Sequence, residues 1–107
     1  MILDQEQSKN IVERLKNELN PLKIFLFGSQ AQGGASSETS DVDLCVIVPD
    51  DGEQSYRKTV RAYKSLRDLK IPKDIVVRHQ SQFEERSHWL NSLENEISRT
   101  GSLIYTR

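Results

Sequence analysis

The 107-residue sequence has few of the features that would place a protein outside the cell or in a membrane. It has one cysteine, Cys45, so no disulfide can form within the chain, and a cytoplasmic location is expected. It has no apolar run of membrane-spanning length, and the polar residues after position 3 leave no room for a signal peptide. Its 16 acidic and 15 basic residues nearly balance, and a net charge of −1 argues against a nucleic-acid partner.

The apolar residues follow helical and strand periodicities in alternation. A helical pattern over residues 11–19 ends at Pro21. Segments that fit buried or edge strands are residues 24–27, 41–48, 73–78 and 103–105. These patterns predict one α/β (α+β) domain over residues 1–107, with a small mixed β-sheet packed against helices.

Two further helices are expected from apolar residues at helical spacing. The apolar positions of the first, which we expect to face the core, are Tyr56, Val60, Tyr63 and Leu66. Its basic positions, which we expect on the solvated side, are Arg57, Arg61 and Lys64. The apolar positions of the second, expected as one helix ending near Gly101, are Phe83, Leu90, Leu93 and Ile97.

The residues with the clearest chemical meaning are Gly28 and Ser29, followed by Asp41 and Asp43. Gly28 allows a close approach of the backbone or a positive φ, and Ser29 offers a hydroxyl and an N–H to a phosphate oxygen. Side chains two apart on a strand share a face, so the two carboxylates lie roughly 7 Å apart along it. Carboxylates this close repel unless a proton or cation lies between them. Mg²⁺ suits the site because it combines carboxylate oxygens with substrate phosphates.

A third carboxylate, Asp74, opens the strand at residues 73–78. A helix separates this strand from the one that carries Asp43, and such a crossover normally makes two strands parallel. Both strands then begin at the same edge of the sheet, which places Asp74 near Asp41 and Asp43. Three carboxylates beside a phosphate-binding loop suit phosphoryl or nucleotidyl transfer with two metal ions.

Simpler explanations exist for each of these residues taken alone. An Asp-x-Asp sequence can begin a strand as a turn or cap, and Asp74 can end the turn after Pro72. The combination with Gly28 and Ser29 favours the metal interpretation. The histidines, His79 and His88, match no zinc spacing with Cys45, and neither is placed to activate Ser29 as a nucleophile.

The Gly-Ser, the Asp-x-Asp and the later Asp resemble the minimal nucleotidyltransferases of the DNA polymerase beta-like superfamily. The C-terminal helix, Gly101 and the Leu-x-Tyr strand are also similar, so the resemblance covers nearly the whole chain. The resemblance implies that Gly28 and Ser29 bind the nucleoside triphosphate. It also implies that Asp41 and Asp43 bind two Mg²⁺ ions, and that Asp74 binds the catalytic ion and helps deprotonate the acceptor hydroxyl.

The same resemblance implies a biological role. Stand-alone members commonly pair with a helical HEPN-type protein in toxin–antitoxin modules, and the nucleotidyltransferase acts as antitoxin by adding AMP from ATP to its partner. We expect a hydroxyl acceptor, with tyrosine favoured; the nucleobase preference and any homo- or hetero-oligomer stay open. The loop differs from the family at Gln32, where Arg is usual, and is longer by about one residue. A small-molecule nucleotidyltransferase and a silent module that neutralises its partner by contact are the alternatives.

Overall fold

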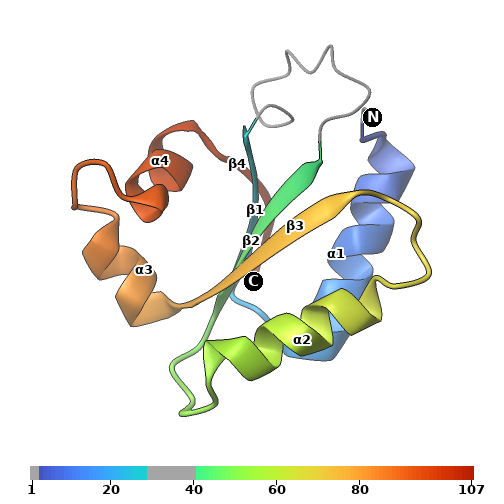
Figure 1. Cartoon of the computed structure of the whole chain (residues 1–107), viewed down its shortest axis with the longest axis horizontal. Helices are drawn as coiled ribbons and strands as arrows, with labels where there is room; N and C mark the ends of the chain where they lie inside the picture. Colours follow the sequence, from blue (N-terminus) through green and yellow to red (C-terminus); the bar gives the residue numbers. More distant parts are fainter. Residues whose placement is uncertain (1–2, 29–40) are drawn as a thin grey trace.

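The computed structural model describes residues 3–28 and 41–107, in which helices and strands alternate (Figure 1). The helices are α1 (Gln5–Leu19), α2 (Ser55–Ser65), α3 (Gln80–Arg86) and α4 (Leu93–Thr100). The strands are β1 (Lys23–Phe27), β2 (Val42–Val48), β3 (Lys73–His79) and β4 (Ser102–Thr106). Within the described ranges, none of the helices is long and apolar enough to cross a membrane.

The strands form one mixed sheet in the order β3-β2-β1-β4. β1 pairs antiparallel with β2 and with β4, whereas β2 pairs parallel with β3. Both the antiparallel return of β2 and the parallel placement of β3 agree with the prediction from the sequence. In this register Asp43 lies opposite Phe27 on one side and Asp74 on the other. β2 and β3 therefore begin at the same end of the sheet, where Asp43 and Asp74 lie next to each other.

Helix α1 begins and ends where its sequence allows. Asp4 caps its first turn by accepting a hydrogen bond from the Gln7 backbone N–H at 2.7 Å, and the Gln7 side chain accepts the Asp4 N–H at 3.1 Å. This reciprocal arrangement satisfies two N–H groups that a helix start leaves unpaired. At the other end Asn20 adopts a left-handed conformation with φ 48°, and Pro21 follows. The predicted helix over residues 11–19 is confirmed.

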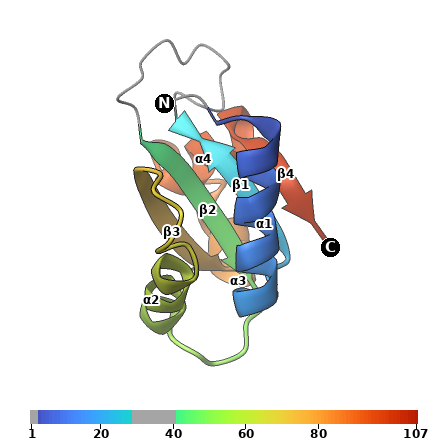
Figure 2. The ribbon, with the colours of Figure 1, turned by 90° about the vertical axis from the view of Figure 1, so that its right-hand side faces the viewer.

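Each face of the sheet packs against a pair of helices, with α1 and α2 on one side and α3 and α4 on the other (Figure 2). Alternate residues of β2 point to the two sides, as strand geometry requires. On the side of α1 and α2 the buried strand residues are Ile24, Leu26, Val42, Leu44, Val46, Val48, Ile75 and Val77. On the other side Cys45 and Ile47 pack with Phe83 and Ile97. Asp43 is in phase with Cys45 and Ile47, so it belongs to the second face.

The orientation predicted for α2 is wrong. Its buried residues are Lys58 and Ala62, with Leu66 just beyond its end. Tyr56 is 71% exposed, and Val60 and Tyr63 are 39% and 38% exposed. Three of the four residues expected to face the core thus form the outer surface of the helix.

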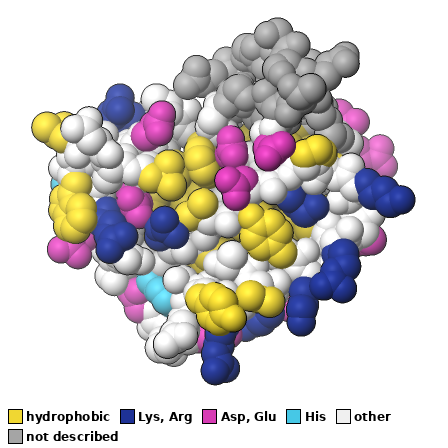
Figure 3. All heavy atoms as spheres, viewed as in Figure 1, with side chains coloured by type: hydrophobic (Ala, Val, Ile, Leu, Met, Phe, Trp, Pro, Cys, Tyr) yellow, Lys and Arg dark blue, Asp and Glu magenta, His cyan; other side chains and the backbone are white. Residues whose placement is uncertain are grey.

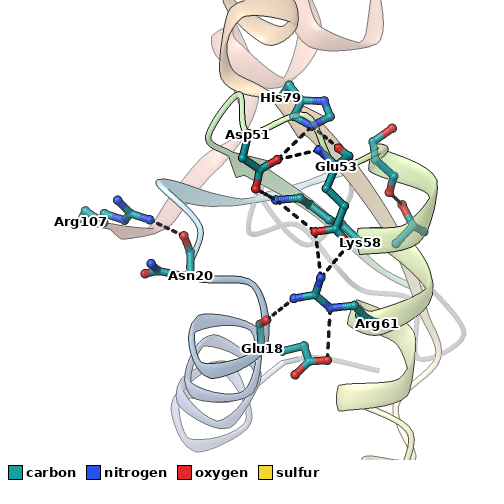
Figure 4. Close-up of polar contacts among 10 residues, drawn as sticks. Glu18, Asn20, Asp51, Glu53, Lys58, Arg61, His79 and Arg107 are labelled. Atoms are coloured by element: carbon teal, nitrogen blue, oxygen red, sulfur yellow. Dashed lines mark hydrogen bonds and ion pairs between the residues drawn. The ribbon is translucent and has the colours of Figure 1, made fainter.

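Ion pairs at the base of α2 explain this orientation (Figure 4). The nearly buried Lys58 ammonium contacts the Asp51 carboxylate at 2.5 Å. Arg61 contacts Glu53 at 2.8 Å and donates to the Glu18 carbonyl oxygen of α1 at 2.8 Å. Contacts with the turn before α2 and with the end of α1 therefore hold the side of the helix that carries Lys58 and Arg61 inward. Apolar spacing alone does not reveal these partners.

Removing the Lys58 side chain should destabilise the fold. Lys58→Ala leaves a space beneath α2 and removes the cation that Asp51 contacts, so we expect a loss of about 1 to 3 kcal/mol in the free energy of unfolding. Lys58→Met fills the space and leaves Asp51, which is partly exposed, to be hydrated. Urea unfolding of both variants is the measurement, and we expect the Met variant to recover at least half of the loss. Equal losses would show that the charge, not the packing of the side chain, holds α2.

The single helix predicted near the C-terminus is two short ones. Helix α3 ends at Arg86, Asn91 adopts a left-handed φ of 69°, and Ser92 caps the start of α4 by accepting the Asn95 N–H at 3.0 Å. The change of direction leaves Leu90 85% exposed, so its predicted place in the core is wrong. Gly101 ends α4 as expected, with its N–H donating to the Ile97 carbonyl oxygen at 2.8 Å.

Candidate functional site

The carboxylates of Asp43 and Asp74 lie side by side where β2 and β3 begin. They occupy paired positions of the parallel ladder, so their side chains project from the same face on strands about 4.8 Å apart. Asp41 is the residue before β2, two positions from Asp43. Asp41 and Asp74 are exposed and Asp43 is half-buried. The topology thus brings these acids to one sheet edge, and acidic side chains gather near the start of β2 in Figure 3.

Within residues 3–28 and 41–107, no basic side chain forms an ion pair with Asp41, Asp43 or Asp74. Partial burial raises the pKa of Asp43, and the neighbouring charges of Asp74 and Asp41 raise it further. Each cause disfavours the ionised form of Asp43. The carboxylates therefore repel one another, and a bound cation or proton would reduce this repulsion. Clusters of this kind are frequent at functional sites.

Gly28 lies directly against the Asp43 carboxylate. It follows β1 with φ +75°, in the left-handed region that favours glycine. A Cβ atom at this position would lie 2.4 Å from Asp43 Oδ2, far inside van der Waals contact. The backbone angle therefore favours glycine, and a side chain here would displace the Asp43 carboxylate. The next residue, Ser29, and the loop position Gln32 lie outside the described residues, so the phosphate-binding role predicted for Ser29 stays a prediction.

Tyr63 connects α2 to the acidic cluster. Its hydroxyl donates to Asp74 Oδ1 at 3.2 Å and accepts the Ile75 backbone N–H at 2.9 Å. Because β3 is an edge strand, the outward N–H of Ile75 has no strand partner, and the phenol supplies one. The hydroxyl thereby fixes one oxygen of Asp74. The sequence gives no signal for this contact, since a tyrosine at helical apolar spacing is typical of a core position.

The donor set of this edge fits a hard divalent cation. Mg²⁺ takes oxygen ligands, and it commonly uses one or two protein carboxylates with substrate phosphates and water completing the shell. Asp43 and Asp74 are adjacent carboxylates. Burial and the acidic neighbours raise the pKa of Asp43 above its usual value. Among the described residues, no three His, Cys, Asp or Glu side chains lie close enough together to hold a metal ion, so the three predicted acids Asp41, Asp43 and Asp74 do not converge on one point in this structure. A nucleotide-dependent ion fits this donor set better than a structural one.

Cys45 and His79 belong to the scaffold. Cys45 is fully buried, and burial raises the pKa of its thiol to about 12, so it is not a reactive thiolate. His79 closes β3, where its Nε2 lies 2.8 Å from the Glu53 carbonyl oxygen at the far end of the strand from Asp74.

The sequence and the fold were compared with known proteins. Residues 8–100 match a family model described as a nucleotidyltransferase domain. No curated protein sequence matches the chain significantly.

Similar folds occur among solved structures at low sequence identity. A crystal structure from Sulfolobus solfataricus, described as a candidate nucleotidyltransferase, is 18% identical with a TM-score of 0.64, over 94% of this chain and 78% of that one. A toxin–antitoxin structure with AMP-PNP is 20% identical with a TM-score of 0.65, over 94% of this chain and 73% of that one. At these low identities the similarity establishes the fold alone, and the assignment of the chain to a family rests on the match to the family model.

Proposed function

Since the chain belongs to the nucleotidyltransferase domain family, we propose that it transfers AMP from ATP to a hydroxyl of a partner protein. We call the end of the sheet that carries Asp41, Asp43 and Asp74 the acidic edge. The proposal rests on this edge, in which Asp43 lies between Gly28 and Asp74. That edge combines carboxylate oxygens with a glycine that permits close approach. These are the components that a metal-bound triphosphate needs.

Each residue of the edge has a distinct proposed role. Asp41 and Asp43 hold two Mg²⁺ ions, and Asp74 holds the catalytic one. Gly28 and Ser29 bind the triphosphate. When bound, the ions would neutralise charge on the phosphates and lower the pKa of the acceptor hydroxyl.

The transfer balances without a further reactant. The acceptor oxygen forms a bond to the α-phosphorus of ATP, and the bond from that phosphorus to the bridging oxygen of pyrophosphate breaks. The acceptor proton passes to the Asp74 carboxylate and then to water. The raised pKa of Asp43 supports a site in which the neighbouring carboxylates favour a bound proton or metal ion.

A protein acceptor fits a domain of this size. The described residues place Asp41 and Asp74 on an exposed edge, which offers little enclosure for a second small substrate. We propose a HEPN-type helical protein as the partner, a tyrosine as the acceptor and antitoxin as the role. The likeness to a toxin–antitoxin structure with AMP-PNP supports a role in a toxin–antitoxin pair. The HEPN-type partner and the tyrosine acceptor rest on the resemblance to the minimal nucleotidyltransferases.

The test is the intact mass of the partner after incubation with this protein, ATP and Mg²⁺. The substrate is the protein encoded by the neighbouring gene, which this proposal expects to be of the HEPN type, and we expect its mass to increase by one or more AMP groups. Replacing that acceptor tyrosine by Phe should remove the gain. No mass gain, with full neutralisation of the partner by contact, would contradict the enzymatic proposal.

Tyr63→Phe should weaken the site without unfolding the chain. Losing the donor to Asp74 leaves one carboxylate oxygen free to rotate, and we expect Mn²⁺ affinity in the presence of AMP-PNP to fall about 10-fold. The Ile75 N–H can be hydrated at the sheet edge, so the stability loss should stay below about 1 kcal/mol. Electron paramagnetic resonance titration of Mn²⁺ and thermal unfolding measure the two effects. Tyr105→Phe is the matched control, and equal Mn²⁺ affinities for all three proteins would refute the role of Tyr63.

A further inference from the structure

The outer side of α2 carries a continuous apolar strip that runs to the acidic edge. We define the α2 strip as Tyr56, Val60 and Tyr63, which follow one another at helical spacings of four and three residues and so lie on one side of the helix. All three are exposed, and a hollow of about 320 Å³ lies at the Tyr56 end, beside Arg57 and Val60. At the other end the Tyr63 hydroxyl contacts Asp74.

The charges along the α2 strip are of one sign. Arg57 adjoins Tyr56, Lys64 lies one turn beyond Val60, and Arg67 lies one turn beyond Tyr63. These three side chains form no ion pair with any other described residue, whereas Lys58 and Arg61 on the inner side are paired. Figure 3 shows basic side chains beside the hydrophobic ones over α2. The surface therefore offers apolar contact bordered by positive charge without a partner.

We propose that the α2 strip is the docking surface for the acceptor protein, through a polypeptide segment with apolar side chains bordered by carboxylates. The inference rests on the proposed function and adds where the partner binds and what its surface contains. Carboxylates of the partner would pair with Arg57 and Lys64, and its apolar side chains would cover Tyr56 and Val60. Because the strip ends at Asp74, a partner seated on it presents its hydroxyl to the edge where transfer occurs.

A protein suits the α2 strip better than a single-stranded RNA. Tyrosines beside basic residues can stack bases, but Val60 at the centre has no aromatic face for stacking. The strip also leads to the acidic cluster, where Tyr63 contacts Asp74 and Asp74 lies beside Asp43 in the parallel ladder. A phosphate backbone following the strip would meet this negative charge, whereas a polypeptide can place a neutral hydroxyl there.

The first experiment measures docking without nucleotide, so that it does not depend on transfer. The probe is the purified product of the neighbouring gene, which the proposed function expects to be the acceptor protein. It is titrated by calorimetry against the wild type and the double variant Tyr56→Glu with Val60→Glu. Buried apolar contacts at the centre of an interface commonly dominate affinity, so we expect Kd to rise roughly 10- to 100-fold. Leu103→Glu, which alters an exposed leucine on β4, is the matched control and should leave Kd within about twofold.

Charge reversal gives an independent measurement. Arg57→Glu with Lys64→Glu should slow association about 10-fold at low ionic strength, and the difference should shrink in salt. Binding of Mg²⁺ with AMP-PNP should be unchanged in both double variants, which verifies that the fold and the acidic edge are intact. A 20-nucleotide RNA titrated against the same proteins should bind none of them at 150 mM salt.

The outcomes separate the two proposals. Strip-dependent docking without any AMP transfer by the wild type would retain the docking surface and refute the enzymatic function. AMP transfer by the wild type, together with wild-type docking and transfer by both strip variants, would overturn the docking surface and retain the function. The inference would also be overturned if the partner failed to bind the wild type even at a 100-fold molar excess. RNA binding to the wild type that is lost in the double variant Tyr56→Glu with Val60→Glu would overturn it as well.

Discussion

Asp43→Asn is expected to abolish nucleotide transfer while leaving the folded chain at least as stable as the wild type. The amide keeps the shape of the side chain and removes the charge that would hold Mg²⁺. Since positioned charges supply much of the stabilisation of a phosphoryl-transfer transition state, we expect the rate to fall by about 10³-fold or more. The assay is mass-spectrometric detection of AMP on the partner protein under saturating Mg²⁺ and ATP.

The stability of this variant follows from the direction of the pKa shift. The pKa of Asp43 is raised in the folded state by burial and by Asp74 and Asp41, so folding favours the protonated carboxyl. Its contribution to stability is present below the unfolded pKa and is lost as the pH rises through the higher folded pKa. At neutral pH the ionised carboxylate therefore destabilises the fold, and the amide removes this penalty. Without metal, we expect the unfolding midpoint of Asp43→Asn to equal or exceed that of the wild type.

The pH dependence gives the contrast and the control. The stability difference between Asp43→Asn and the wild type should be fully present above the raised folded pKa of Asp43 and should vanish only well below the ordinary Asp pKa of about 3.9, where the carboxyl is neutral in both states. Asp50→Asn, beyond the opposite end of β2, should retain transfer. A lower midpoint for Asp43→Asn at pH 7 than for the wild type would show that the carboxylate is structural. Retained transfer would remove Asp43 from the site.

Gly28→Ala is expected to have the second largest effect. A methyl group would lie 2.4 Å from Asp43 Oδ2, so either the carboxylate or the end of β1 must move. The left-handed φ of +75° adds backbone strain of about 1 kcal/mol or more for a residue with a side chain. Because small misplacements of a reacting group are costly, transfer should fall by about 100-fold. Transfer rate and unfolding midpoint are measured together on the same preparation.

Gly52→Ala provides the matched control for this substitution. Gly52 has φ +85°, but its added Cβ would meet no atom within 4 Å. It therefore carries the backbone strain without the clash against Asp43. We expect both variants to lose stability and only Gly28→Ala to lose transfer. Equal transfer by both would show that the position of Gly28 against the carboxylate does not matter for the chemistry.

The arrangement of the sheet could be predicted from the sequence because its determinants are local. Short apolar runs marked the strands, and the lengths of their connections gave the pairing directions of β1 with β2 and β2 with β3. From that topology the proximity of Asp43 and Asp74 followed directly. The functional roles of Gly28, Ser29, Asp41, Asp43 and Asp74 rest on the family pattern and stay predictions.

The features that escaped prediction depend on ion pairs and on one backbone conformation that the spacing of apolar residues does not reveal. Apolar spacing placed Tyr63 in the core, but the pairing of Lys58 with Asp51 and of Arg61 with Glu53 and Glu18 turned α2 the other way. The contact of Tyr63 with Asp74 exists only because of that orientation. Likewise, Phe83 and Leu93 share one helical phase in the sequence, yet the left-handed Asn91 divides the segment into α3 and α4.

The most direct test of the central claim is a crystal structure of this protein with Mn²⁺ and AMP-PNP, examined by anomalous scattering. The claim is that the edge formed by Asp41, Asp43 and Asp74 binds a metal-bound nucleotide. The account predicts an anomalous peak coordinated by Asp43 and at least one of the other two carboxylates, with the triphosphate beside Gly28. A nucleotide bound elsewhere, or at this edge with no metal on Asp43, would contradict it.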